Sequence, residues 1–252
     1  MLTIGVDVAS EAREKTASCS IEWSGGHAKV VDVVSKKVGD ADIQSYVQEA
    51  DVVGLDVPLG WPKAFVGAVH GHHSQPPTWP EPAPRMHRLR LRKTDRWIKR
   101  VTGLAPLSVS AGWIAVPALR IAALRIGEPR DGSGKVVEVY PKAAMKVWEL
   151  PYEKYKGKRY GASSTALTPA GIERDRIVGS LQRKGRGWLY GDGWWGLFRD
   201  NDDALDALIA ALVARAWIQG LCHPISARCK DDAAVEGWIA LPCEDSLRRL
   251  PV

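Results

Sequence analysis

The sequence predicts one α/β domain built on a mixed β-sheet, with helices packed against both of its faces. Three extended and largely apolar segments near the N-terminus are joined by short connections, which is typical of an antiparallel meander. A helical segment then leads into a fourth extended segment, and a strand reached through a helix normally lies parallel to an earlier strand. This succession of three strands, one helix and a further strand favours a mixed sheet.

Each of these elements has a local signal in the sequence. The first strand is nearly continuous in apolar residues, a Gly25-Gly26 pair marks the turn between the second and third, and prolines end the fourth. The helix before the fourth strand has apolar residues at helical spacing. The expected segments are residues 2–9, 16–23 and 28–38 for the strands, 40–50 for the helix and 51–62 for the fourth strand.

The rest of the chain alternates between regular and irregular segments. We expect a helix with a proline interruption at 108–127, a fifth strand at 135–141 and the start of a helix at 142–148. Thr168 and Pro169 predict the start of another helix, as N-cap and first helical residue. A long apolar helix follows at 201–219, and a short strand at 236–242 is possible. Residues 1–252 are expected to form a single domain, with a proline-rich and basic insertion at about 62–130 and a glycine-rich, aromatic and basic one at about 151–200.

Composition excludes several classes of protein. No apolar run is long enough to span a bilayer, and the N-terminus lacks the basic region of a signal peptide. The four cysteines are scattered, which indicates reduced thiols and a cytoplasmic protein. The formal net charge is +6, yet Arg85–Arg100 alone holds eight Arg or Lys residues against one Asp. This concentration of charge favours a local contact with an anionic partner.

Two aspartates occur in otherwise apolar strands. Asp7 follows Val6 in the first strand, and Asp56 lies late in the fourth. An ionised carboxylate in such a strand is costly unless it is paired or bound to a metal. If the two strands are parallel neighbours, both carboxylates lie at the same edge of the sheet, where open α/β sheets tend to bind ligands. Glu138, late in the fifth strand, would lie at that edge as well if its strand is also parallel.

The long helix at 201–219 begins with a cluster of carboxylates. Acidic residues at a helix N-terminus are favoured by capping and by the helix dipole, and this explains Asp200 and Asp202. It does not explain Asp206, which lies one turn further in, between Leu205 and Ala207. Asp203 and Asp206 are three residues apart and therefore share a face of the helix.

Several carboxylates in a dry site repel one another unless a cation lies between them. Ligand sets made only of oxygen suit Mg²⁺ or Mn²⁺. Two such ions, about 4 Å apart, stabilise the attacking and leaving oxygens of a phosphoryl displacement. The acidic residues therefore predict a metal site, with Asp7, Asp56, Asp203 and Asp206 as both catalytic residues and metal ligands and Glu138 as a further ligand.

The ordered motifs resemble a known family. IGVDVAS, GLDVPLGWP, RKTDRWIKR, VEVYPKAAM, DDALDALIAAL and EGWIALP, spread over nearly the whole chain, are similar to the DUF429 family of predicted nucleases with a ribonuclease H-like fold. The DDALDAL helix is also similar to the last catalytic motif of RuvC-type resolvases. The resemblance implies a five-stranded sheet in the order 3-2-1-4-5, counted along the chain, with the second strand antiparallel and the acidic turn of the late helix near Asp7 and Asp56.

The resemblance also implies a role for the RKTD motif, with Arg92 on a phosphate and Asp95 holding an arginine or a metal. The basic segment as a whole predicts contact with the backbone of a nucleic acid, DNA or RNA, through residues that release counterions. The residues assigned to this contact are Arg85, Arg92, Lys93, Asp95 and Arg96.

The favoured function is metal-dependent hydrolysis of nucleic acid. The alternatives are a non-catalytic module that binds nucleic acid or protein, a small-molecule phosphoesterase, and a nucleotide-binding protein of the actin-like branch. The last of these needs a glycine-rich phosphate loop after the first aspartate, and DVASEAREKTA contains no glycine. The histidines His70, His72 and His73 match no standard zinc spacing.

Overall fold

A six-stranded mixed sheet forms the centre of the computed structural model, which describes residues 1–11, 15–127, 129–161 and 165–252. The strand order is β5-β4-β1-β2-β3-β6. The strands are β1 (Leu2–Asp7), β2 (Ala17–Ser24), β3 (His27–Val34), β4 (Val52–Asp56), β5 (Val136–Glu138) and β6 (Leu189–Tyr190). Only β2 is antiparallel to its neighbours, since β1 pairs parallel with β4, β4 with β5, and β3 with β6.

The sixth strand corrects the expected topology. The resemblance implies five strands in the order 3-2-1-4-5, and that order is wrong at one edge because β6 pairs with β3. β6 has only two residues, too few to show an alternating pattern in the sequence. It lies in the segment 151–200 that the sequence presents as an insertion, so part of that segment belongs to the central sheet. The short strand expected at 236–242 forms only two isolated bridges, one between Ile239 and Glu138 and one between Pro242 and Cys222.

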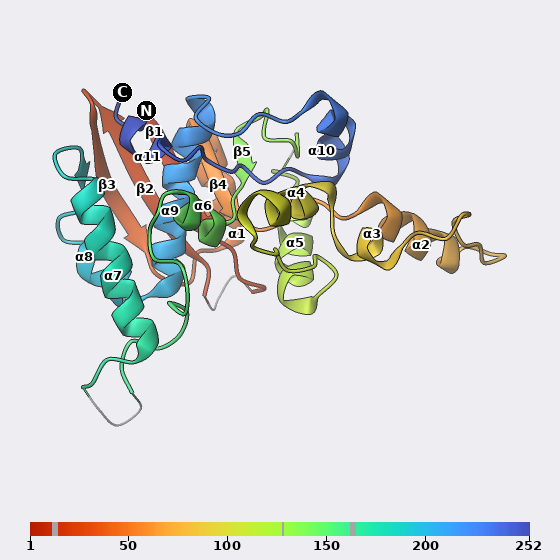
Figure 1. Ribbon diagram of the computed structural model, residues 1–252, viewed down its shortest axis with the longest axis horizontal. Helices are drawn as coiled ribbons and strands as arrows, with labels where there is room; N and C mark the ends of the chain where they lie inside the picture. The colour runs from red at the N-terminus through yellow and green to blue at the C-terminus, as the bar shows by residue number, and fades with distance from the viewer. Residues whose placement is uncertain (12–14, 128, 162–164) are drawn as a thin grey trace.

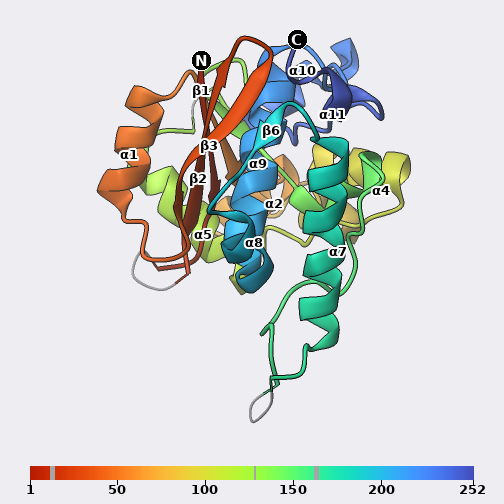
Figure 2. The ribbon, with the colours of Figure 1, turned by 90° about the vertical axis from the view of Figure 1, so that its left-hand side faces the viewer.

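Helices cover both faces of the sheet (Figure 2). One face packs against α1 and α5, through a core that includes Ile4, Val53, Ile43 and Ile121. The other face packs against α9 and, beyond it, α6, α7 and α8. The helices are α1 (Asp40–Glu49), α2 (Lys63–His73), α3 (Met86–Arg90), α4 (Lys93–Thr102), α5 (Gly112–Leu124), α6 (Pro141–Val147), α7 (Pro169–Lys184), α8 (Trp195–Asp200), α9 (Asp202–Ile218), the 3₁₀ turn η1 (Ala227–Cys229), α10 (Lys230–Glu236) and α11 (Ser246–Arg249).

The local signal for a helix start at Thr168 is confirmed by its hydrogen bond, and a second helix has a cap of the same kind. The Thr168 hydroxyl accepts a hydrogen bond from the Gly171 backbone N–H (3.1 Å), and Pro169 is the first residue of α7. The Asn201 side chain accepts one from the Ala204 backbone N–H (2.7 Å) at the start of α9. Both caps satisfy backbone donors that have no partner within the helix. Pro117 lies inside α5, so the expected interruption does not divide that helix.

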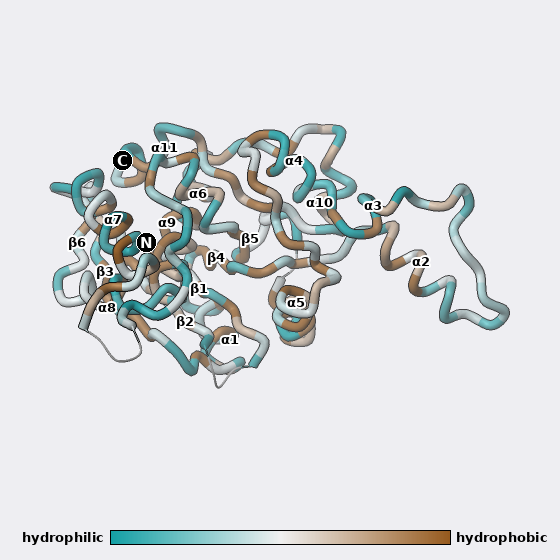
Figure 3. Tube along the Cα trace, turned by 60° about the horizontal axis from the view of Figure 1, so that its bottom comes forward, coloured by the Kyte–Doolittle hydropathy of each residue, from teal (hydrophilic) through white to brown (hydrophobic). Residues whose placement is uncertain are grey.

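The segment between β4 and α4 forms an arm that projects from the body (Figures 1 and 3). It carries α2, the proline-rich connection and α3, and His70, His72 and His73 lie in the last turn of α2. The basic segment Arg85–Arg100 is divided between α3 at the base of this arm and α4 on the body. Among the described residues, no helix is both long enough and apolar enough to cross a membrane.

Candidate metal centre

The parallel pairing of β1 and β4 places two aspartates side by side. Asp7 is the last residue of β1, Asp56 is the last residue of β4, and the two are register partners. Both side chains are partly buried, at the carboxyl edge of the sheet. The sequence predicts that Asp7 and Asp56 lie close together at one edge of the sheet, and the strand register confirms this.

The third aspartate comes from α9, which packs unusually close to the sheet. Gly5 and Gly54 are register partners in β1 and β4, and both lie under this helix. A Cβ on Gly5 would overlap the backbone of Ala207 and Ala211, and one on Gly54 would overlap that of Ala210. Because neither glycine has a side chain, α9 can approach the two strands closely and bring the fully buried Asp206 to their carboxyl ends.

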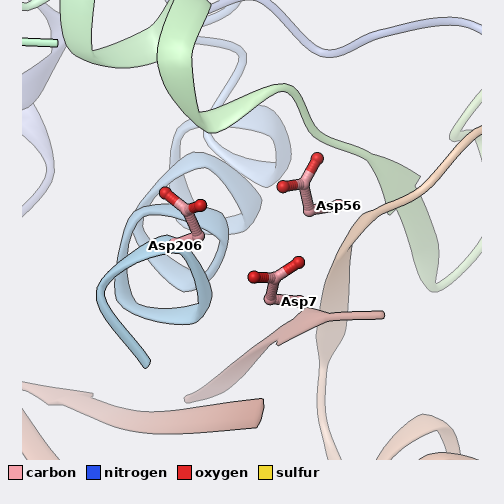
Figure 4. Close-up of side chains that lie close together, drawn as sticks. All are labelled: Asp7, Asp56 and Asp206. Atoms are coloured by element: carbon pink, nitrogen blue, oxygen red, sulfur yellow. The ribbon is translucent and has the colours of Figure 1, made fainter. Parts of the chain in front are cut away.

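The carboxylates of Asp7, Asp56 and Asp206 form one compact cluster. One oxygen from each lies within 4.8 Å of the others, and Figure 4 shows the three carboxylates close together, one from the helix and two from the strand ends. No other group of three potential metal ligands of the His, Cys, Asp or Glu types occurs in the described part of the chain. The spacing suits a cation held by oxygen atoms.

The charges of this cluster are strongly coupled. Burial, together with the neighbouring carboxylates, raises the pKa of Asp56 to about 8 and that of Asp7 well above its usual range. Burial also raises the pKa of Asp206, against the effect of Lys156. These shifts show that full ionisation of the three groups is unfavourable without more positive charge nearby. A divalent cation would provide it.

Lys156 supplies one positive charge to the cluster. Its ammonium forms an ion pair with Asp206 and lies 3.6 Å from Asp7. Burial opposes its charge, but the carboxylates of Asp206 and Asp7 hold the pKa of Lys156 well above its usual range. One ammonium balances only one of the three carboxylates. The donor set therefore fits a divalent metal ion, for which Asp7, Asp56 and Asp206 would be the ligands.

Two tyrosines also face the cluster. The buried Tyr155 hydroxyl donates a hydrogen bond of 2.8 Å to Asp206 Oδ1. Burial and the negative charges of Asp56 and Asp206 raise the pKa of Tyr140 to about 12. Both phenols therefore stay protonated at neutral pH and can act as hydrogen-bond donors.

The loop that carries Tyr155 and Lys156 is held by the two helices beside it. Arg174 of α7 donates to the carbonyls of Tyr155 (2.5 Å) and Gly157 (2.7 Å). The Gly157 backbone N–H donates to Asp202 in the first turn of α9 (3.0 Å). Asp202 therefore tethers this loop in addition to its place at the helix start, while Asp200 forms an ion pair with Arg159.

Asp203 and Glu138 lie outside the compact cluster, contrary to their expected role as metal ligands. Asp203 is half-buried and near enough to raise the pKa of Asp7, but its carboxylate does not join the other three. Both oxygens of Glu138 accept hydrogen bonds from Arg92, at 2.6 and 2.7 Å, and one also accepts from the Leu59 backbone N–H. Glu138 is thus engaged in an ion pair, which occupies the atoms a metal would need.

Arg92 is a structural cation in this arrangement. It is 2% exposed and bonds through its guanidinium to Glu138 and Asp95, the latter at 2.8 and 3.1 Å. The expectation that Arg92 contacts a phosphate is therefore not met, because its donors are already taken by two buried carboxylates. The alternative for Asp95, that it holds an arginine, is the one observed. This network joins the start of α4 to the end of β5.

The other basic residues lie on the surface around α4. Arg85 is exposed at the N-cap of α3. Lys93 forms an ion pair of 3.0 Å with Asp232, and Arg96 donates to the Leu91 carbonyl. A pocket of about 280 Å³ opens beside this helix and contains no carboxylate among its lining residues, which are Lys93, Arg96, Trp97, Arg100, Ser226, Arg228 and Cys229.

The sequence does not indicate every residue of the site. Lys156 and Tyr155 lie in an irregular segment, where no periodic pattern relates them to the strand ends. Tyr140 could have been predicted from the sequence. It follows Glu138 by two residues in an extended segment, so both side chains lie on the same side of the chain. Arg228 reaches the basic pocket from a distant part of the chain, which only the fold reveals.

Comparison with known proteins identifies a family without a described function. No curated protein and no solved structure matches the chain. The sequence pattern of one family matches residues 5–230, which include the three clustered aspartates, Lys156 and the Arg92 network. The chain therefore belongs to the family described as "Protein of unknown function (DUF429)".

Proposed function

We propose that this protein is a metal-dependent hydrolase that cleaves phosphodiester bonds of nucleic acid. The observation that carries the proposal is the convergence of Asp7, Asp56 and Asp206 within 4.8 Å at the carboxyl edge of the sheet. A buried group of carboxylates with shifted pKa values in a pocket is typical of a functional site rather than of a core. The ligands are all oxygen atoms, so the proposed ion is Mg²⁺ or Mn²⁺.

The arrangement of the strands supports the same proposal. An antiparallel meander continued by parallel strands, with carboxylates on the first and fourth strands and on a late helix, is the arrangement implied by a ribonuclease H-like fold. We propose this fold class for the chain, with β6 as an addition at one edge. The fold class by itself does not define a reaction, so the proposal depends on the site.

The residues at the site would have different roles in the reaction. Asp7, Asp56 and Asp206 would hold the metal, which supplies charge stabilisation at the oxygens of a phosphoryl group when bound. Tyr155 would fix the orientation of Asp206 through its hydrogen bond. Lys156 would provide a positive charge next to the substrate phosphate, since 50% of its side chain is exposed.

The choice of nucleic acid as substrate is supported by the basic surface around α4. Lys93, Arg96 and Arg100 follow one face of this helix, and Arg228 lies across the pocket from them. Arg92, at the start of the same helix, lines the pocket above the carboxylates. We propose that a polyanion bound along α4 extends from there to the acidic cluster, with an affinity that falls with added salt.

The test is hydrolysis by the parent protein and by Asp7→Asn and Asp56→Asn. Single-stranded, duplex and branched DNA and RNA should be offered with Mg²⁺ and with Mn²⁺. The proposal expects cleavage by the parent and at least a hundredfold loss in both variants, with normal activity in Asp192→Asn, whose carboxylate is exposed and does not belong to the cluster. Equal activity in the variants and the parent would exclude the site.

A second measurement separates catalysis from simple binding. Calorimetric titration with Mn²⁺ is expected to show binding to the parent and to Asp192→Asn, and none to Asp56→Asn. A parent protein that binds oligonucleotides but neither Mn²⁺ nor Mg²⁺ would instead be the non-catalytic binding module.

A further inference from the structure

The pocket above the carboxylates has two chemically different sides. Its volume is about 300 Å³, which is within the range of small-ligand sites. One side is polar and contains Asp7, Asp56 and Lys156. The other is apolar and comes from α5 and the turn before it, through Pro106, Leu107, Trp113, Ile114 and Pro117. With a divalent cation held by Asp7 and Asp56, a ligand that fills this pocket needs an anionic end that binds the metal and a flat apolar end.

Trp113 dominates the apolar side. It is 84% exposed, more than any other tryptophan among the described residues, and Leu107 beside the same pocket is 62% exposed. Indole rings normally bury most of their surface, as Trp148 does here at 1% exposure. The first turn of α5 thus presents an unpartnered aromatic face at the pocket, although buried positions are available on the same helix, as Pro117 and Ile121 show.

A nucleotide has one group suited to each side of the pocket. Its base can stack on an indole face, and its phosphate is the group that the polar side would bind. A base within a duplex is covered on both faces by its neighbours, so only an unpaired base can use Trp113 in this way. We infer that this pocket takes an unpaired nucleotide of a single-stranded nucleic acid, with the base against Trp113 and the phosphate toward Asp7 and Asp56. The inference rests on the proposed function, because it names the substrate of the same site.

The surroundings favour a strand over a free nucleotide. The pocket wall includes Arg92 at the N-cap of α4, whose guanidinium is already paired, and the basic side chains of Lys93, Arg96 and Arg100 follow along that helix. A free mononucleotide has no further phosphates to place along this face. A strand that enters the pocket with one nucleotide can extend its neighbouring phosphates over α4.

The experiment measures binding without turnover. A labelled single-stranded decanucleotide, as DNA and as RNA, its duplex, and a free mononucleotide are titrated by fluorescence anisotropy or competition, with Ca²⁺ in place of Mn²⁺. Trp113→Ala is compared with Trp113→Phe, which keeps an aromatic ring. Trp79→Ala is the matched control, because Trp79 is also exposed (47%) but lies on the arm and does not line the pocket.

The inference expects the parent to bind the single strand more tightly than the duplex. Trp113→Ala should weaken single-strand binding by about tenfold, the effect of losing one base–aromatic stack. Trp113→Phe should restore most of this loss, and Trp79→Ala should bind like the parent. Equal affinity for single strand and duplex, or an unchanged affinity in Trp113→Ala, would overturn the inference. A mononucleotide that binds as tightly as the strand, with the same dependence on Trp113, would overturn the assignment to a strand.

The outcome is separable from that of the proposed function. Binding that depends on Trp113, in a protein that cleaves no substrate with Mg²⁺ or Mn²⁺, would contradict the hydrolase and support the nucleotide pocket. Cleavage that depends on Asp7 and Asp56, but with normal binding and rate in Trp113→Ala, would support the hydrolase and contradict the pocket assignment.

Discussion

The ammonium of Lys156 forms an ion pair with Asp206 inside the carboxylate cluster. The ammonium offsets part of the negative charge of the three carboxylates. Lys156 belongs to an irregular loop between α6 and α7 rather than to the sheet. Lys156 therefore competes with a divalent cation for the same carboxylates. Half of its side chain is exposed, although its ammonium is paired with a buried carboxylate.

Replacing Lys156 with methionine is expected to tighten Mn²⁺ binding. The variant removes the competing charge and keeps a side chain of similar length, so the affinity should rise by about tenfold, or roughly 1.4 kcal/mol. The measurement is calorimetric titration of metal-free protein with Mn²⁺. Lys158→Met changes an exposed lysine of the same loop that lies outside the cluster, and this variant should bind like the parent. Weaker binding in Lys156→Met would mean that the lysine supports the metal site.

The metal-free protein is expected to lose stability as the pH rises from about 4 to about 8. The pKa of Asp56 is raised to about 8, so over this window the native state keeps a proton that the unfolded chain releases. The free energy of unfolding, measured by urea denaturation at several pH values, should therefore fall through the window and level off above it. Asp56→Asn should flatten this dependence and be more stable than the parent at pH 8. A parent curve that rises with pH would contradict the sign of this shift.

Adding Mn²⁺ should reverse the trend at the upper end of this range. Metal binding requires ionised carboxylates, so it competes with protons and strengthens as the pH rises. A saturating concentration, a hundred times the dissociation constant, is expected to stabilise the fold by about 2.7 kcal/mol at pH 8. Thermal denaturation at pH 8 and at pH 5 measures the difference, which should be small at pH 5. An equal gain at both pH values would indicate a metal site elsewhere in the chain.

The Arg92 network is expected to be a major source of stability. Arg92→Leu leaves Glu138 and Asp95 without their buried partner, and loss of one partner from such a pair typically costs about 3–5 kcal/mol. Urea denaturation measures this cost. Arg100→Leu, an exposed position on the same helix, should change the free energy of unfolding by less than about 0.5 kcal/mol. A small effect of Arg92→Leu would show that the two carboxylates become protonated at little cost.

The close approach of α9 to the sheet predicts a large effect of Gly54→Ala. The added methyl group would overlap the backbone of Ala210, so the helix must shift, at a cost of about 3 kcal/mol. The same shift moves Asp206 away from Asp56 and should weaken Mn²⁺ binding. Gly67→Ala in α2, where the methyl group meets nothing within 4 Å, is the control and should be neutral or slightly stabilising. Unchanged Mn²⁺ affinity in Gly54→Ala would show that metal binding does not depend on the close packing of α9 against the sheet.

Parts of the fold are predictable because their signals are local. The caps at Thr168 and Asn201 depend on a side chain and a backbone donor three residues away, so neighbouring letters of the sequence are sufficient. The strands that end in Asp7 and Asp56 have apolar patterns of their own, and the helix between strands three and four makes their parallel pairing the expected one. β6 has neither a pattern nor a typical connection, and its place beside β3 is seen only in the fold.

The sequence does not predict which charged residues contact one another in the fold. In the sequence, all five expected metal ligands are carboxylates at or near the ends of apolar elements, and no local pattern separates ligands from the others. They are Asp7, Asp56, Asp203, Asp206 and Glu138. In the structure Asp7, Asp56 and Asp206 share a centre, Glu138 pairs with Arg92, and Asp203 lies to one side. The difference depends on distances of a few ångströms between segments that are far apart along the chain.

The sequence by itself therefore determined the kind of protein, a mixed α/β sheet with an acidic edge and a separate basic segment, because apolar periodicity and charge are properties of neighbouring residues. Only the tertiary structure decided that Lys156 balances Asp206, that Arg92 is buried, and that Trp113 faces the same pocket as Asp7. These relationships arise from the packing of α9, α4 and α5 around the sheet, and electrostatic energy depends on the resulting distances between charges rather than on their order in the chain.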